Sequence, residues 1–165
     1  VLPIILPPEI ERHFLVFEGK QDLEKQMVRR LRGWRRPNTR FVVMRDQDSG
    51  DCVAIKRKLQ GLCATGGRTD AVVRIACREM EAFFVGDWHA VANAFGRPGL
   101  GDNDRRAKFR DPDLLGSPSK ELMRLIPGYQ KRSGARRISR HLNPSRNRSA
   151  SFHALMRALG TLAAP

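Results

Sequence analysis

Short apolar runs alternate with amphipathic stretches through the first hundred or so residues, and this alternation constrains the fold more than any other feature. The apolar runs cover residues 13–17, 41–44 and 71–76, and each is typical of a buried β-strand. After each run, apolar side chains recur at nearly 3.6-residue spacing, as in a helix that buries one face. These positions are Leu23, Met27, Leu31 and Trp34, then Cys52, Ile55, Leu59 and Leu62, then Met80, Phe84, Trp88, Val91 and Phe95. The pattern predicts an α/β fold around a mainly parallel sheet flanked by helices.

The rest of the chain is predicted to be mostly helical. Residues 96–118 are rich in Gly, Pro and Asp and predict a long irregular connection, of a length that more often marks function than scaffolding. Further helices are expected from Pro118, over residues 136–142 and after a cap at Ser151. We expect one compact domain in which a core over residues 1–104 carries a basic, mostly helical extension over residues 105–165.

Charge is unevenly distributed along the 165 residues, and the net charge is +14. Of the 31 Lys and Arg, 17 lie in residues 1–104 and 14 in residues 105–165, whereas the 17 Asp and Glu divide into 14 and 3. Cations without acidic neighbours favour a polyanion, and the dense phosphates of nucleic acid, DNA or RNA, fit best. The side chains expected to contact it are Lys20, Lys108, Arg110, Arg132, Arg136, Arg137 and Arg140.

Several other classes of protein are disfavoured by the sequence. No apolar run approaches the roughly 18 residues that cross a bilayer, so no membrane partner is expected. Prolines interrupt the apolar start, which argues against a secretory signal. The three cysteines are widely spaced, as expected of reduced thiols in a cytoplasmic protein. No Gly-x-Gly-x-x-Gly follows the first predicted strand, which argues against a dinucleotide-binding dehydrogenase.

Acidic residues gather where the predicted strands end. Glu18 closes the first strand, Asp46 and Asp48 follow the second, and Glu79 and Glu81 follow the third. Because parallel strands end at one edge of a sheet, we expect these carboxylates to be neighbours. Crowded carboxylates repel one another unless a cation lies among them, and Mg²⁺ prefers such oxygens. The alternative is that some of them, with Asp22 and Asp51, only cap helices.

Two of these segments resemble the TOPRIM domain of topoisomerases, primases and the overcome-lysogenization-defect nucleases. Phe17-Glu-Gly-Lys-Gln-Asp22 is similar to its first motif and Met44-Arg-Asp-Gln-Asp48 to its second. Nearly the whole chain is similar to a bacterial family described as a TOPRIM-like domain of unknown function, through residues 18–23, 45–52, 74–81, 129–136 and 148–152. The resemblance implies a TOPRIM-like fold whose acids hold Mg²⁺ or Mn²⁺ during phosphodiester chemistry.

In the nuclease branch a Glu that begins the helix after the third strand joins the metal site. Either Glu79 or Glu81 could fill that place, and we favour Glu79, because a helix that begins near it would keep its side chain at the sheet edge and turn Glu81 away. The metal ligands are then expected to be Glu18, Asp46, Asp48 and Glu79.

The sequence therefore predicts a Mg²⁺- or Mn²⁺-dependent nuclease. Asp46 and Asp48 would hold the metal, Glu18 would be a further ligand or the general base, and Lys131, or else Lys20, would stabilise charge on the phosphate. The alternative is a non-catalytic module that binds nucleic acid or another protein, as in a phage-defence or toxin system. Ser149 and Ser151 are predicted to be caps rather than nucleophiles.

Overall fold

The computed structural model describes residues 6–163 and shows a helix-rich α/β protein with a small parallel sheet. The sheet consists of two strands, β1 (Val42–Asp46) and β2 (Val72–Ala76), which pair in register from Val42↔Val72 to Asp46↔Ala76. The helix between them, α3 (Cys52–Thr65), makes the connection that a parallel pair requires. The predicted α/β class is confirmed at this level.

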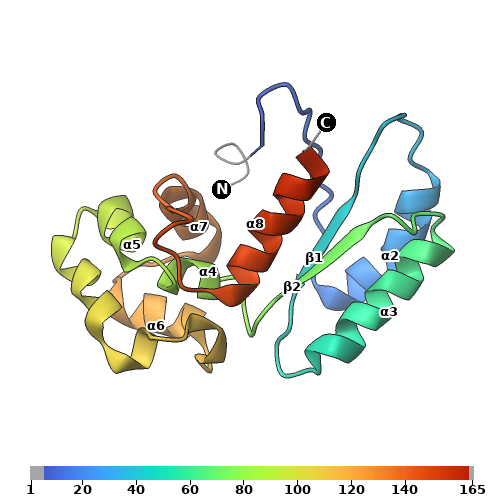
Figure 1. Cartoon of the computed structure of the whole chain (residues 1–165). Coiled ribbons are helices and arrows are strands. Elements are labelled where there is room, and N and C mark those ends of the chain that lie inside the picture. The colour runs from blue at the N-terminus through green and yellow to red at the C-terminus, as the bar shows by residue number, and fades with distance from the viewer. Residues whose placement is uncertain (1–5, 164–165) are drawn as a thin grey trace.

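Helices cover both faces of the strand pair (Figure 1). One face carries Val43, Val73 and Ile75, which pack against α2 (Lys20–Arg32) and α3. The other face carries Met44 and Ala76 and is covered by α8 (Ala150–Ala163). Side chains alternate between faces along a strand, so Asp46, which is paired with Ala76, lies on the α8 side.

The remaining helices pack beyond the ends of β1 and β2, around a second apolar cluster (Figure 1). They are α4 (Ala82–Val85), α5 (Trp88–Phe95), α6 (Pro118–Leu125) and α7 (Lys131–Ser139), with short 3-10 segments at Pro98–Arg105, Ala107–Phe109 and Pro112–Leu114. Trp88, Phe109 and Phe152 are almost fully buried in this cluster. Within the described residues, no helix is both long and apolar enough to cross a bilayer.

The strand predicted over residues 13–17 is not formed. This segment has no regular secondary structure and no strand partner among residues 6–163, and Phe14 and Val16 are 68% and 84% exposed. Its polar neighbours Glu11 and His13 instead contact Arg36, in the loop before β1. An apolar run alone does not make a strand, because strand formation depends on the neighbouring strand as much as on composition.

Three predicted helices differ from those observed. The helix expected over residues 80–95 is divided into α4 and α5 at Gly86 and Asp87. Helix α7 begins at Lys131 rather than at Arg136. Helix α2 begins at Lys20, ahead of the expected cap Asp22, whose carboxylate accepts a hydrogen bond from the Glu18 backbone at 3.0 Å. The Asp51 cap of α3 is confirmed, since its side chain accepts from Ala54 N at 2.6 Å.

Candidate active site

The loops that follow β1 and β2 are joined to each other beyond the end of the sheet. Gln47 N–H donates to the Ala76 carbonyl at 2.9 Å, and Asp48 N–H donates to the Arg78 carbonyl at 2.8 Å. Asp48 and Arg78 both have positive φ, 57° and 59°. Such backbone is costly for side chains other than Gly, and for Arg more than for Asp. The bonded loops hold the acidic residues after both strands along one rim.

Asp46 is the best-placed carboxylate of this rim. Its Oδ1 accepts a hydrogen bond from Met80 N–H at 2.8 Å, which ties the end of β1 to the segment after β2. The pKa of Asp46 is raised to about 6, mainly by burial and also by the charges of Glu81 and Asp48. The hydrogen bond from Met80 and the charge of Lys131 lower the pKa, but by less. A half-buried carboxylate beside two others is therefore easy to protonate and is a favourable position for a cation.

Glu81 is the second carboxylate of the rim. It is only 6% exposed, and its Oε1 lies 3.6 Å from Lys131 Nζ at the start of α7. Next to it, Tyr129 is buried and its hydroxyl has no hydrogen-bond partner within residues 6–163. Burial, Glu81 and Glu79 together raise the pKa of this tyrosine well above its usual range. The site thus combines Asp46, Glu81, Lys131 and a neutral phenol.

Glu79, which we favoured as the third acid, has a different contact. Its Oε2 accepts from Ser119 N–H at 2.8 Å and its Oε1 from the Ser117 hydroxyl at 3.4 Å, so its side chain caps the first turn of α6. The reason for preferring it does not hold, because helix α4 begins at Ala82 and residues 79–81 form a turn. In the structure Glu81, and not Glu79, contacts Lys131.

Asp48 and Glu18 lie at the outer corner of the rim. Asp48 is exposed, and its Oδ2 is 3.0 Å from Lys20 Nζ and 4.0 Å from an Arg45 nitrogen. The Lys20 contact brings the start of α2 to the end of β1. Glu18 stands two residues before Lys20, across Gly19 with φ 107°, and its exposed carboxylate has no partner among residues 6–163.

The donor chemistry of the rim suits a hard divalent cation with an incomplete protein shell. Among the described residues, no group of three or more His, Cys, Asp or Glu side chains is close enough to hold a metal ion. Mg²⁺ is usually held by one or two carboxylates, with water and phosphate as its other ligands. Asp46 and Asp48 could supply these two, with Lys20 and Lys131, each about half exposed, moving aside.

The seven basic side chains predicted to contact nucleic acid differ in their surroundings. Lys20 is paired with Asp48, as described above, and Lys108 lies 2.6 Å from Glu121. Arg137 donates to the Ala94 carbonyl at 2.7 Å. The remaining four are exposed, and their side chains make no hydrogen bond or ion pair with residues 6–163: Arg110, Arg132, Arg136 and Arg140.

Two acids that the sequence analysis did not single out, the buried Asp87 and the partly buried Asp113, are structural. Asp87 is fully buried between α4 and α5. Asp113 accepts from the Ser149 hydroxyl at 2.7 Å and from Ser151 N–H at 2.7 Å, just before and within the first turn of α8. Ser149 Oγ accepts from Phe152 N–H at 3.0 Å, so Ser149 is the cap of α8. The cap predicted at Ser151 is wrong, because Ser151 lies inside the first turn and its hydroxyl donates to Asp113 at 3.0 Å.

The raised pKa of Asp46 gives a pH-dependent prediction for stability. The folded protein binds this proton more tightly than the unfolded chain, so stability is lost as the pH rises from about 4 to about 6. Asp46→Asn keeps the oxygen that accepts from Met80 and removes the charge. After allowance for solvent screening, it should raise the free energy of unfolding by about 1–2 kcal/mol at neutral pH.

Urea unfolding at several pH values would measure this difference. The gain from Asp46→Asn should shrink as the buffer is acidified below about pH 6, and the exposed Asp102→Asn should show no such gain. A constant difference at every pH would mean that burial does not act on the Asp46 charge.

The fold and the rim define a helix-rich α/β protein with a cluster of carboxylates and lysines where two parallel strands end. Residues 2–160 match the family described as "Domain of unknown function (DUF4276)", and the chain belongs to this family. The predicted membership of a family of unknown function is thus confirmed, and the relation to TOPRIM domains stays a prediction. Comparison with curated proteins and with solved structures found no match.

Proposed function

We propose that the protein is a metal-dependent phosphodiester hydrolase acting on nucleic acid, with its active site at the rim formed by Asp46, Asp48 and Glu81. The observation that carries the proposal is Asp46 itself, a half-buried carboxylate with a raised pKa, at the end of a parallel strand and beside two further acids and Lys131. Perturbed acids of this kind are concentrated at functional sites.

The TOPRIM-like relation is part of this proposal. It is supported by the contact between Lys20 and Asp48, which places the Glu18-Gly19 turn beside the Asp46-x-Asp48 segment. These are the two segments that resemble TOPRIM motifs. The unformed strand at residues 13–17 speaks against a close match, and the proposal rests on the acids rather than on the extent of the sheet.

Each side chain has a role in this scheme. Asp46 and Asp48 would hold a Mg²⁺ or Mn²⁺ ion, and Glu18 would add a ligand or accept a proton from the attacking water. When bound, the ion would polarise a phosphoryl oxygen and lower the pKa of water. Lys131, oriented by Glu81, would balance the negative charge that develops on the phosphate.

A cleavage assay tests the proposal. Single-stranded, duplex and structured nucleic acids would be incubated with the protein in Mn²⁺ and in EDTA. We expect cleavage in Mn²⁺ alone, reduced at least about a hundredfold by Asp46→Asn and by Glu81→Gln. Asp48→Asn should reduce cleavage to the same extent. It should leave the backbone unchanged, because Asn tolerates the positive φ of this position as well as Asp does.

Two controls give the assay its meaning. Asp102→Asn, on an exposed residue outside the rim, should cleave like the parent. Glu79→Gln should keep most of the activity, since Glu79 caps α6. A loss of activity equal to that of Glu81→Gln would instead mean that Glu79 is part of the active site. Cleavage that survives Asp46→Asn, or none by the parent on any substrate, would refute the proposed activity.

One observation favours a second function, a non-catalytic module that binds nucleic acid. Lys20 and Lys131 already neutralise Asp48 and Glu81, as in a purely structural set of ion pairs. Titration calorimetry separates the two functions. Nucleic-acid binding without any Mn²⁺ binding would favour the module, and Mn²⁺ binding that Asp46→Asn abolishes would favour the enzyme.

A further inference from the structure

A second basic region lies within residues 1–104, where basic and acidic residues are nearly equal in number. Residues 25–45 contain no acidic residue. Their basic side chains are Lys25, Arg29, Arg30, Arg32, Arg35, Arg36, Arg40 and Arg45. Several of them fall in the last turn of α2 and in the loop that leads to β1. With 8 basic residues among 21, positive charge is denser here than in residues 105–165, which hold 14 basic residues among 61.

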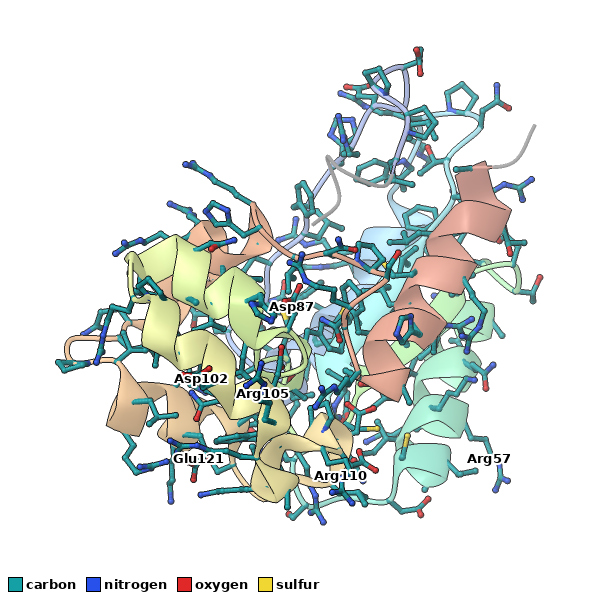
Figure 2. The ribbon with its side chains drawn as sticks, turned by 60° about the vertical axis from the view of Figure 1, so that its left-hand side comes forward. Arg57, Asp87, Asp102, Arg105, Arg110 and Glu121 are labelled. Carbon is teal, nitrogen blue, oxygen red and sulfur yellow. The ribbon has the colours of Figure 1, made fainter. Side chains whose placement is uncertain are left out.

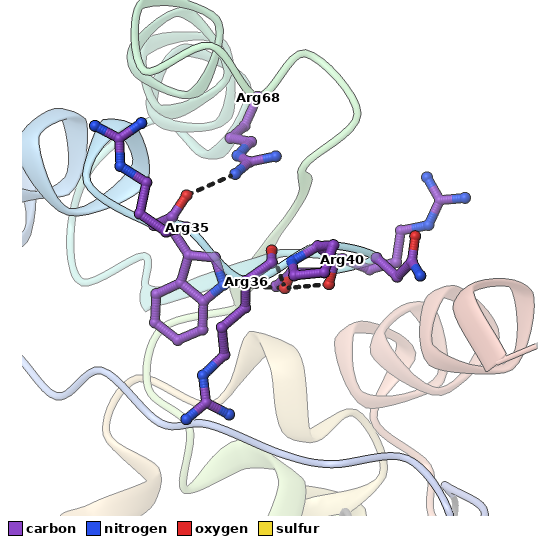
Figure 3. Close-up of a pocket in the computed structure, with 8 residues that line it drawn as sticks. Arg35, Arg36, Arg40 and Arg68 are labelled. Carbon is purple, nitrogen blue, oxygen red and sulfur yellow. Dashed lines mark hydrogen bonds between the residues drawn. The ribbon is translucent and has the colours of Figure 1, made fainter.

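This loop forms an open pocket of about 560 Å³ (Figure 3). Four arginines line it, Arg35, Arg36 and Arg40 from the loop and Arg68 from the segment after α3, together with Trp34. The four side chains point in different directions around the loop. One small anion could not contact them all, whereas an extended chain of anions could.

The loop is held in shape by its own contacts. Trp34 Nε1–H donates to Thr39 Oγ1 at 2.9 Å, and the Thr39 hydroxyl donates to the Arg36 carbonyl at 3.0 Å. The Trp34 ring meets Phe41 edge to face at 5.7 Å between centroids. Arg68 lies 4.9 Å over the Phe41 ring and donates to the Trp34 carbonyl at 3.3 Å. A loop ordered in advance loses less entropy on binding.

The charges of the loop are available to a ligand. Arg35 is exposed, and its side chain has no hydrogen bond or ion pair with residues 6–163. Arg36 and Arg40 are paired with Glu11 at 2.9 Å and Asp70 at 3.3 Å, and all four of these side chains are well exposed. Exposed pairs contribute little free energy, so a phosphate can replace the acid.

We propose that this surface, Trp34 to Arg40 with Arg68, binds the sugar-phosphate backbone of a nucleic acid strand. Guanidinium groups match phosphate oxygens in geometry and charge. The half-buried Trp34 ring, which also contacts the rings of His13 and Phe41, gives the arginine cluster an aromatic side chain on which a base can stack. Stacking beside a row of cations is typical of surfaces that bind a nucleic acid strand.

The surface is separate from the proposed active site. It precedes β1, whereas Asp46 ends β1, so the five residues of the strand, about 15 Å, lie between them. Binding here needs neither the carboxylates nor a metal, and the inference therefore stands independently of the proposed hydrolase activity.

Binding to a labelled single-stranded oligonucleotide, measured in EDTA at several salt concentrations, tests the proposal. The double variant Arg35→Gln, Arg40→Gln would be compared with Arg57→Gln, Arg105→Gln, which loses the same charge at two exposed positions outside the surface (Figure 2). We expect the first variant to bind about tenfold more weakly than the second at low salt, with a salt slope smaller by about 1–2.

Tryptophan fluorescence locates the contact. The chain has two tryptophans, and Trp88 is fully buried, so quenching by the oligonucleotide should come from Trp34 and disappear in Trp34→Phe. Equal affinity of the two double variants, or quenching that persists in Trp34→Phe, would overturn the proposal. Equal competition by polyglutamate at matched ionic strength would show a general polyanion surface and would also overturn it.

Discussion

Replacing Asp87 by alanine is expected to lower the free energy of unfolding by about 3–5 kcal/mol. The carboxylate is fully buried. It accepts from Ala90 N–H at 3.0 Å, from Asn143 N–H at 2.9 Å and from two Arg146 nitrogens at 3.3 and 3.4 Å. Alanine would leave the buried Ala90 N–H and the partly buried Asn143 N–H without their acceptor, and unpaired buried donors are expensive. The Arg146 side chain is 43% exposed, so its donors can bind water instead.

Thermal and urea unfolding would measure the effect. For a chain of this size the melting temperature should fall by about 6–20 °C. Asp102→Ala is the matched control, since Asp102 is an exposed acid of the same helical region and should change stability by less than about 0.5 kcal/mol (Figure 2). If the two variants have the same melting temperature, the Asp87 network does not hold α5 to the segment after α7.

Asp87 also helps to position the proposed active site, because it binds the segment that follows α7. Its partners Asn143 and Arg146 lie just after α7, and α7 carries Lys131 at its first position. The same region is bound again at Asn147, whose side chain donates to the Phe83 carbonyl at 2.7 Å. A buried polar network therefore fixes the helix that brings Lys131 to Glu81, and it lies in a part of the fold with no strands.

Patterns that depend on near neighbours predicted much of the fold. The strands β1 and β2 were expected at residues 41–44 and 71–76 and form within two residues of those bounds. Helix α3 and its Asp51 cap were also expected. In each case the signal is local: a short apolar run, a spacing of 3.6, or a side chain that accepts from a backbone N–H three residues on.

The features that depend on distant partners were missed. The sequence of residues 13–17 is typical of a strand, but the described part of the chain offers no partner strand for it. Glu79 and Glu81 differ by two positions in a turn, and only the fold shows that one meets Ser119 and the other Lys131. Asp87 lies within an otherwise helical pattern, where nothing marks it as buried.

Counting net charge over residues 1–104 and 105–165 also missed local detail. The N-terminal stretch has nearly as many acids as bases, which conceals the acid-free run at residues 25–45. In the C-terminal third, where a surplus was expected to stay free, Lys108 is paired with Glu121 and Arg137 with a carbonyl. Net charge shows that a region is basic, and only contacts show which cations can meet a phosphate.

Two glycine-to-alanine substitutions in helices should have opposite effects on stability. Alanine is favoured over glycine in a helix by about 1 kcal/mol. At Gly61, within α3, an added Cβ meets nothing within 4 Å, and Gly61→Ala should stabilise by about 0.5–1 kcal/mol. At Gly134, within α7, the same Cβ would overlap the buried Tyr129 ring at Cε2, Cδ2 and Cζ. The overlap should outweigh the propensity and give a net loss of about 2 kcal/mol.

The Gly134 substitution also reports on the site. Tyr129 stands two residues before Lys131, and its ring lies against both α7 and Phe95, so a displaced ring would shift the start of α7. We expect Gly134→Ala to lower the melting temperature and also to weaken the cleavage or metal binding that depends on the rim, while Gly61→Ala leaves both functions intact. If Gly134→Ala instead gained stability as Gly61→Ala should, the ring could move without cost and Tyr129 would not fix the position of Lys131.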